Sequence, residues 1–276
     1  MVKMLAAITT PFGAGDEVDL DAFGAHLEWL LEQGLDGAFV AGTTGEGVLL
    51  ESDEVIALVE RAVQVVGGER VIAQVGRPST RATAELLERA YAAGAAQAAA
   101  YVPWFYAAGD AQVRGHFLAL LEASAGRPLL GYTIPKRHVN VLAPAVLGEL
   151  AAAGLAGMKD STADPECHTA FVAAVAGKPF RLYTGTDGLV LGALRSGGFG
   201  AITAVAAARP DLLAALGRAL DAGDAAAADQ AGAVLAAEKD AIAREGATIP
   251  AVKARVRAAL AARGVDYPAT PRAPFA

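Results

Sequence analysis

Several residue types and patterns are scarce in this chain of 276 residues, and each shortage excludes a class of protein or site. A single cysteine, Cys167, rules out a disulfide framework and any cysteine-rich zinc or iron–sulfur site. Lysine and arginine number 23 against 30 acidic residues, so the formal charge is −7 and no basic stripe for a nucleic acid is visible. No apolar run approaches the ~20 residues that a membrane span needs.

The N-terminal residues 1–5 enter a short apolar stretch without the small-residue cleavage site of a signal peptide. What the chain does have is apolar side chains: 54% of its residues are hydrophobic, which is ample for a large core and unlike a disordered chain. We therefore expect a cytoplasmic globular protein whose partners are small molecules, with no nucleic acid and no membrane among them.

Short apolar runs that end in glycine, threonine, serine or aspartate are the clearest structural signal, because the many alanines blur helical periodicity. Eight such runs recur about every 25–35 residues, the length of one strand-plus-helix unit. They cover residues 5–11, 37–41, 70–76, 95–103, 128–135, 155–159, 181–185 and 200–205.

The segments between these runs predict amphipathic helices that begin at capping residues. A helix is expected over 19–34, and further helices are expected to open at Ser52 and Ser79. Aspartates 110, 164 and 187 are placed as additional caps or first-turn acids, which the helix dipole favours.

Strands that alternate with helices pair in parallel, and eight units favour closure into a (β/α)8 barrel over an open sheet of five or six strands. Beyond Leu220 the pattern becomes wholly helical, over 224–243 and 250–263. We therefore expect a TIM barrel over residues 1–222, with C-terminal helices over residues 223–276 packed on it.

Lys159 is the first candidate for chemistry, because barrel enzymes carry their catalytic residues just past the strand ends. It is one of only six lysines, against seventeen arginines, and it ends a run that should be packed on both faces. Burial disfavours an ammonium ion, so this lysine could be the free amine that attacks a carbonyl, or it could simply pair with Asp160. Tyr132 ends the preceding strand, where its phenol could move protons beside that amine or fill the core.

Residues 42–46, Gly-Thr-Thr-Gly-Glu, combine glycines that allow close backbone approach with two hydroxyl groups. Such a segment can hold a carboxylate, although a tight turn is the simpler interpretation of this motif alone. We expect no metal site and no dinucleotide cofactor. The four histidines have no metal-ligand spacing, and the third glycine of a dinucleotide fingerprint would fall on Val18.

Three segments together resemble the N-acetylneuraminate lyase and dihydrodipicolinate synthase family of Schiff-base pyruvate aldolases. They are residues 42–46, Tyr132-x-x-Pro135 and residues 157–161 (Gly-Met-Lys-Asp-Ser), at the ends of the second, fifth and sixth expected strands. Residues 183–187 and 200–203 add two more segments typical of the family, and the resemblance covers essentially the whole chain.

The resemblance implies a role for each residue. Lys159 would form an imine with pyruvate or with the pyruvoyl end of a longer 2-oxo acid, Tyr132 would be the acid and base, and Thr43 would relay its protons. A homo-oligomer is implied as well, most simply a tetramer, and the aromatic residues 104–106 would be costly to leave in water. Substrate contacts are expected from Thr44, Arg137, Ser161, Gly185, Asp187 and Ile202.

Two positions bear on which member of the family this is. In the synthases a second tyrosine, from a neighbouring subunit, completes the proton relay, and Phe105 stands at that position here. The relay would then be absent or supplied by Tyr106. Arg137 matches an arginine that binds the carboxylate of the synthases' second substrate. Phe105 thus argues against a dihydrodipicolinate synthase, whereas Arg137 argues for one.

Cleavage of a 2-oxo-3-deoxy sugar acid into pyruvate and an aldehyde is the preferred function at this point. The run 101–106 resembles the 2-dehydro-3-deoxygluconate aldolases, and Ser161, Thr186, Asp187 and Thr203 could bind a polyol tail. Condensation of pyruvate with aspartate semialdehyde, the 4-hydroxy-tetrahydrodipicolinate synthase reaction, is the alternative. An inactive barrel that has lost its chemistry is the alternative of another class.

Overall fold

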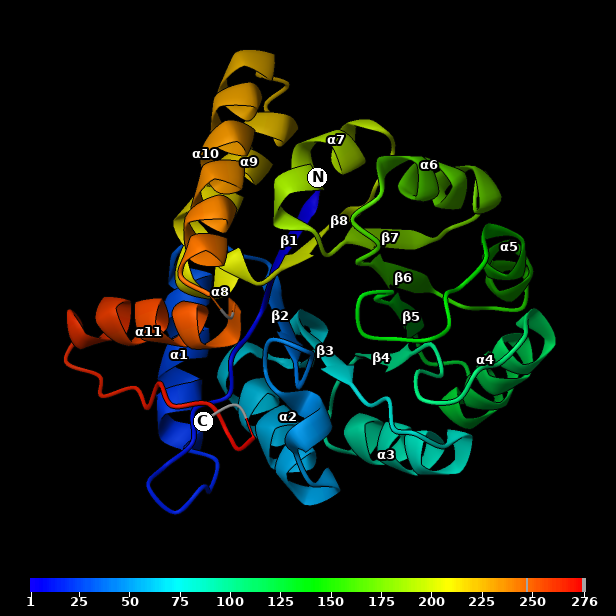
Figure 1. The fold of residues 1–276 in the computed structure, drawn as a ribbon, viewed down its shortest axis with the longest axis horizontal. Coiled ribbons are helices and arrows are strands. Elements are labelled where there is room, and N and C mark those ends of the chain that lie inside the picture. Colours follow the sequence, from blue (N-terminus) through cyan, green and yellow to red (C-terminus); the bar gives the residue numbers. More distant parts are fainter. Residues whose placement is uncertain (247, 275–276) are drawn as a thin grey trace.

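The computed structural model describes residues 1–246 and 248–274, and within them eight parallel strands close into a barrel (Figure 1). The strands pair in chain order, and β1 closes the barrel against β8. Each strand overlaps one of the eight apolar runs, so the predicted fold class is confirmed. The strands are β1 (Lys3–Ala7), β2 (Gly37–Val40), β3 (Val71–Gln74), β4 (Gln97–Tyr101), β5 (Leu129–Thr133), β6 (Gly157–Asp160), β7 (Arg181–Thr184) and β8 (Gly200–Thr203).

Helices connect the strands and surround the barrel (Figure 1). They are α1 (Leu20–Glu32), α2 (Ser52–Val66), α3 (Thr80–Ala92), α4 (Asp110–Ser124), α5 (Pro144–Ala152), α6 (Pro165–Ala174), α7 (Val190–Arg195), α8 (Val205–Ala208) and α9 (Pro210–Asp221). Two further helices, α10 (Ala225–Arg244) and α11 (Thr248–Ala261), follow the barrel as predicted. Within the described residues no helix is both long enough and apolar enough to cross a membrane.

Three of the six predicted helix starts are confirmed by side-chain caps, and Asp110 and Asp187 lie in first turns without capping them. Asp19 accepts hydrogen bonds from two backbone N–H groups of α1, Ser79 accepts one from Ala82, and Asp164 caps α6. The expected start at Ser52 is displaced by one residue. Glu51 is the capping residue there, because its side chain and that of Glu54 bond each other's backbone in a capping box.

The apolar interior has two layers. Side chains that point into the barrel form a small cluster that includes Phe39, Tyr101, Tyr132, Tyr183 and Ile202. A much larger cluster fills the space between the strands and the surrounding helices. The inner cluster is rich in tyrosine, so the barrel centre contains phenol groups close to the strand ends where chemistry is expected.

The C-terminal segment returns to the start of the chain. After α11 it passes α1 and ends beside α2, close to the loop that precedes α1 (Figure 1). Tyr267 is fully buried, and its phenol lies 2.6 Å from the hydroxyl of Thr9, just past β1. The last described residues are therefore packed against the barrel.

Candidate active site

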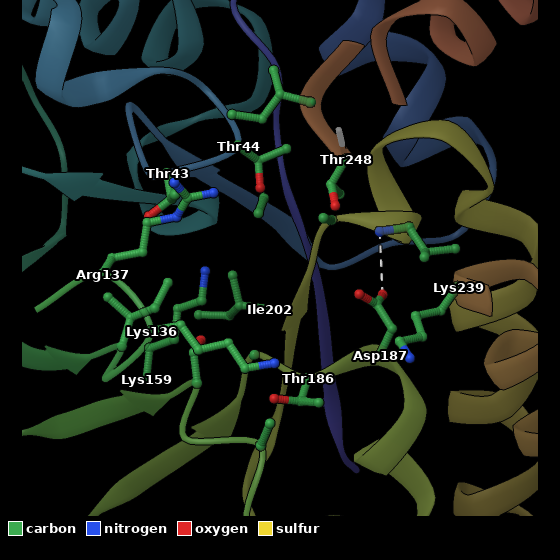
Figure 2. Close-up of a pocket in the computed structure, with 18 of the residues that line it drawn as sticks. Thr43, Thr44, Lys136, Arg137, Lys159, Thr186, Asp187, Ile202, Lys239 and Thr248 are labelled. Carbon is green, nitrogen blue, oxygen red and sulfur yellow. Dashed lines mark hydrogen bonds between the residues drawn. The ribbon is translucent and has the colours of Figure 1, made fainter. Parts of the chain in front are cut away.

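A cavity of about 380 Å³ opens at the carboxyl ends of the strands, and it brings together nine of the site residues expected from the sequence (Figure 2). Residues from both halves of the barrel and from the C-terminal helices line it. The nine expected residues on its walls are Thr43, Thr44, Tyr132, Arg137, Lys159, Ser161, Gly185, Asp187 and Ile202. Their chemical roles remain predictions.

Lys159 lies on β6 between Tyr132 on β5 and Tyr183 on β7, in register with both. Its residue is 3% exposed, and its Nζ lies 4.5 Å from the ring centroid of Tyr132 and 4.4 Å from that of Phe39. A Cβ on Gly185 would come within 2.9 Å of the Lys159 side chain, so glycine is needed there to leave room for it. The amine thus sits at the cavity floor over two aromatic faces.

The alternative interpretation of Lys159, a simple ion pair with Asp160, is wrong. The carboxylate of Asp160 points to the other side of the strand, where its Oδ2 lies 2.8 Å from Nδ1 of the buried His168. Its Oδ1 accepts hydrogen bonds from the backbone N–H and hydroxyl of Thr162. Because Asp160 is occupied in this way, it leaves the amine of Lys159 free to face the cavity.

A hydroxyl network adjoins Lys159. The Thr43 hydroxyl lies 3.3 Å from the phenol of Tyr132 and 3.1 Å from the phenol of Tyr101. The two tyrosine rings stack with their centroids 4.9 Å apart. Burial, followed by the proximity of Tyr132, raises the pKa of Tyr101, while the hydrogen bond with Thr43 opposes that shift. Three hydroxyl groups of one chain therefore form a continuous path beside the amine.

Tyr101 was missed by the sequence reasoning, which left the relay either absent or supplied by Tyr106. Tyr106 is 79% exposed and Phe105 is 68% exposed, so neither lies near Thr43 in its own chain. Tyr101 ends β4 in register with Tyr132 on β5. A signal was present in the sequence: both tyrosines end apolar runs that are consecutive along the chain, so they lie on adjacent strands.

The loop 42–46 forms one wall of the cavity through Thr43 and Thr44, and Thr44 is 9% exposed. Its shape is fixed by backbone bonds from Glu46 to Thr43 and from Gly47 to Gly42, at 3.1 and 3.0 Å. Gly47 cannot carry a side chain, because a Cβ there would collide with the backbone of Ala41. The motif is thus both a tight turn and part of the cavity.

The opposite wall carries the polar residues expected to hold a substrate tail. Asp187 accepts a hydrogen bond from the backbone N–H of Val205, 3.1 Å away, and Figure 2 shows its carboxylate at the cavity edge. Burial raises the pKa of Asp187, and a hydrogen bond from Thr203 opposes that shift. Thr186 and Ser161 also line the cavity, whereas Thr203 is fully buried behind Asp187 and does not.

Two lysines at the mouth were not singled out from the sequence. Lys136 follows β5 beside Arg137, and Lys239 comes from α10 on the side of Asp187 (Figure 2). Three of the six lysines of the chain therefore line one cavity of a protein whose net charge is −7. Among residues 1–246 and 248–274 no group of three or more metal-ligating side chains is found.

Comparison with known proteins agrees with this geometry. The model of the dihydrodipicolinate synthetase family matches residues 1–276. A curated relative, the 4-hydroxy-tetrahydrodipicolinate synthase of Exiguobacterium sp., is 33% identical over 271 residues, which cover 98% of this chain and 90% of that protein.

Solved structures share the fold over the whole chain. YagE of Escherichia coli K12, a prophage protein of the dihydrodipicolinic acid synthase family solved with pyruvate, has a TM-score of 0.93 at 24% identity, covering 100% of this chain and 93% of that one. KD(P)GA from T. tenax has a TM-score of 0.87 at 26% identity, covering 99% of this chain and 92% of that one.

Proposed function

This chain belongs to the dihydrodipicolinate synthetase family, and from that premise we propose that it condenses pyruvate with aspartate semialdehyde. It is an enzyme of the class I pyruvate-dependent lyases and synthases. The sugar-acid cleavage preferred from the sequence is not confirmed, and the curated relatives support the synthase reaction better.

The first step is attack by the Lys159 amine on the ketone carbon of pyruvate. The addition gives a carbinolamine, and loss of its hydroxyl group as water leaves a protonated imine. Tyr132 supplies the proton that departs with the hydroxyl, and Thr43 passes protons to and from that phenol. Thr44 and the backbone of its loop donate hydrogen bonds to the pyruvate carboxylate. The contacts between Thr43 and Tyr132 and the free face of Lys159 support these roles.

The second step forms the carbon–carbon bond. The imine draws electrons from the adjacent methyl group, which loses a proton to give an enamine. The enamine carbon then attacks the aldehyde carbon of aspartate semialdehyde, and the resulting alkoxide takes a proton. The amino group of the second substrate attacks the imine carbon and displaces Lys159, so the ring closes and the free enzyme returns. One water is released for each pair of substrates.

The observation that carries the proposal is the positive charge at the cavity mouth. Lys136, Arg137 and Lys239 add three cationic side chains to the cavity that holds Lys159, and of these Lys239 also bonds the exposed carboxylate of Asp240. A neutral polyol aldehyde needs no such charge, whereas aspartate semialdehyde carries a carboxylate that these groups attract and orient. Arg137 is the residue best suited to a two-point contact with it.

A second candidate is cleavage of a 2-oxo-3-deoxy sugar acid. The polar wall formed by Ser161, Thr186 and Asp187 favours it, and so does the fold shared with KD(P)GA from T. tenax. In that reaction the same imine and enamine form in reverse order, and these side chains would bind the hydroxyl groups of the tail.

The two reactions are separated by assaying them side by side with one preparation. We expect condensation of pyruvate with aspartate semialdehyde to proceed, and release of pyruvate from 2-dehydro-3-deoxygluconate to be at least about 100-fold slower, the discrimination typical of sites with charged partners. Efficient cleavage without condensation would reject the synthase and establish the second candidate.

A further inference from the structure

We propose that the C-terminal segment from Lys253 to Arg272 is a clamp on the loop 42–46, and that Glu46 and Lys253 are positioning residues for pyruvate binding. The inference rests on the proposed roles of Thr43 and Thr44 in that loop. It concerns residues far from the cavity floor, which act on the substrate through the loop.

Glu46 is the point where the clamp holds the loop. It is 2% exposed and adopts a left-handed backbone conformation, with φ of 57°, that non-glycine residues rarely take. Such a conformation persists only where the surroundings impose it. Its carboxylate accepts a hydrogen bond on each oxygen, 2.9 Å from Nζ of Lys253 and 2.8 Å from the backbone N–H of Arg272. Both partners come from the far end of the chain.

Lys253 is completely buried on α11. Besides Glu46, its ammonium group donates to the backbone carbonyl of Thr270 at 2.9 Å and lies 4.6 Å from the ring centroid of Phe12. Burial lowers the pKa of Lys253, and the Glu46 carboxylate opposes that shift. A buried ion pair adds little to stability compared with apolar side chains of the same size, and here the pair fixes the position of the Glu46 carboxylate.

Arg272 fastens the end of the segment to two other elements. Its guanidinium bonds both carboxylate oxygens of Glu54 on α2, each at 2.7 Å, and lies 3.0 Å from the carboxylate of Asp16. It also donates to the backbone carbonyl of Leu49, just past the loop. The segment therefore contacts the loop through Glu46 and contacts residues on either side of the loop in the sequence through Asp16, Leu49 and Glu54.

The same helix that carries Lys253 also borders the cavity. Thr248 and Ile249, in the first turn of α11, line the cavity wall about one turn before Lys253 (Figure 2). A shift of α11 would thus move a wall of the cavity and release Glu46 together. The C-terminal segment can be docked on the loop or released from it, and a ligand favours the state that it binds better. If pyruvate binds the docked state better, docking should raise the affinity for pyruvate by the same factor by which pyruvate favours docking.

The test measures pyruvate binding without a second substrate. The full chain is incubated over a range of pyruvate concentrations, the imine is reduced with borohydride, and the labelled fraction is read by intact mass. Arg272→Ala and Lys253→Met should raise the half-saturating pyruvate concentration about tenfold, within the usual range of such couplings. Arg272→Lys, which keeps one contact to Glu54, should lie between Arg272→Ala and the parent.

The matched control is Arg263→Ala, which removes an exposed ion pair with Glu32 from the same C-terminal segment. It should leave the half-saturating concentration unchanged, and a thermal melt confirms that each variant is folded at the assay temperature. In the parent chain, saturating pyruvate should slow hydrogen exchange of the peptide that contains the Arg272 amide.

The inference would be overturned if folded Arg272→Ala and Lys253→Met had the half-saturating pyruvate concentration of the parent. It would also be overturned if pyruvate left the hydrogen-exchange rate of the Arg272 peptide unchanged. Should the parent itself take no label, the imine chemistry of the proposed function fails first, and the clamp fails with it. The clamp is supported if the parent takes the label, Arg272→Ala needs more pyruvate to reach half-saturation, and the control Arg263→Ala does not.

Discussion

The phenol of Tyr101 lies 3.1 Å from the hydroxyl of Thr43, the same hydroxyl that lies 3.3 Å from the phenol of Tyr132. Tyr101 also lines a smaller cavity of about 150 Å³ together with Trp104, Arg137 and His138. Under the roles proposed for Lys159 and Tyr132, protons can pass from Tyr132 through Thr43 to Tyr101 within the same chain. A phenylalanine at position 105 is compatible with turnover if this internal path carries them.

Replacement of Tyr101 by phenylalanine tests that path. Tyr101→Phe keeps the ring that stacks on Tyr132 and removes only the hydroxyl, so we expect kcat to fall about 100-fold, the contribution of a positioned proton-transfer group. The comparison is Phe105→Tyr, which adds a hydroxyl at the position of the synthases' second tyrosine and should change kcat by less than about twofold, because the internal path already carries the protons. Steady-state kinetics as a function of pH distinguish a lost proton path from a distorted site. Full activity of Tyr101→Phe would show that proton transfer needs no Tyr101 hydroxyl and that water or Tyr132 alone carries it.

Removal of Lys159 tests the covalent step. Pyruvate with borohydride should add one reduced pyruvyl group to the parent and none to Lys159→Ala, because no other amine lies on the cavity floor beside Tyr132. Lys136→Ala is the matched control, since this lysine lines the same cavity at its mouth. Intact mass spectrometry gives the result directly. A full adduct on Lys159→Ala would assign the imine to a different lysine.

Much of this site could be predicted because its residues end successive apolar runs. A barrel brings those ends together whatever the identity of the helices between them, so Lys159, Tyr132 and Thr43 could be grouped from spacing and family resemblance alone. Tyr101 follows the same rule, but a tyrosine at a strand end is more often a core residue. Only the contact with Thr43 in the structure separates the two interpretations.

Other contacts carry no local pattern at all. Lys253 and Glu46 are 207 residues apart, and nothing in either segment indicates that α11 will pack over the loop. Lys239 lies on α10, and nothing in the sequence indicates that this helix will border the cavity. Asp160 looked like a partner for its neighbour Lys159, yet adjacent residues on a strand point to opposite faces, and Asp160 pairs with His168 instead.

The charge at the cavity mouth predicts a selective effect on the second substrate. Arg137→Ala and Lys239→Ala should each raise KM for aspartate semialdehyde about tenfold, in line with loss of a charge-assisted contact, and leave KM for pyruvate unchanged. The increase should shrink as salt is added, because ions screen exposed charges. Lys178→Ala, a lysine outside the cavity, is the control. Equal changes in both KM values would contradict a role restricted to the second substrate.

Stability should depend on pH through His26. Burial lowers the pKa of His26 to about 4 in the folded chain, against the ordinary value of 6.5. The unfolded chain therefore binds a proton between these values that the folded chain does not, so the free energy of unfolding falls as pH drops from 6.5 toward 4 and levels off below. The contribution is at most about 3 kcal/mol. Urea unfolding of His26→Gln should show a shallower decline; parallel curves for variant and parent would reject this assignment.

An exposed apolar surface predicts self-association. Phe105 and Tyr106 are 68% and 79% exposed, and Val139 and Val141 beside them are 63% and 52% exposed. These residues are neighbours, since Val139 bonds the backbone of Trp104 and Asn140 bonds that of Tyr106. Aromatic and aliphatic side chains gathered in this way are typical of interfaces, and the family resemblance suggests a tetramer.

Light scattering at micromolar concentration should therefore give a mass above that of one chain. The double substitution Phe105→Ser and Tyr106→Ser should lower it, because two aromatic side chains at one patch supply much of the apolar area that an interface buries. Val234→Ser removes an exposed valine from α10, away from this patch, and should leave the mass unchanged. A parent that is a monomer at that concentration would refute a subunit interface at residues 104–106. The aromatic cluster would then simply cap its own barrel.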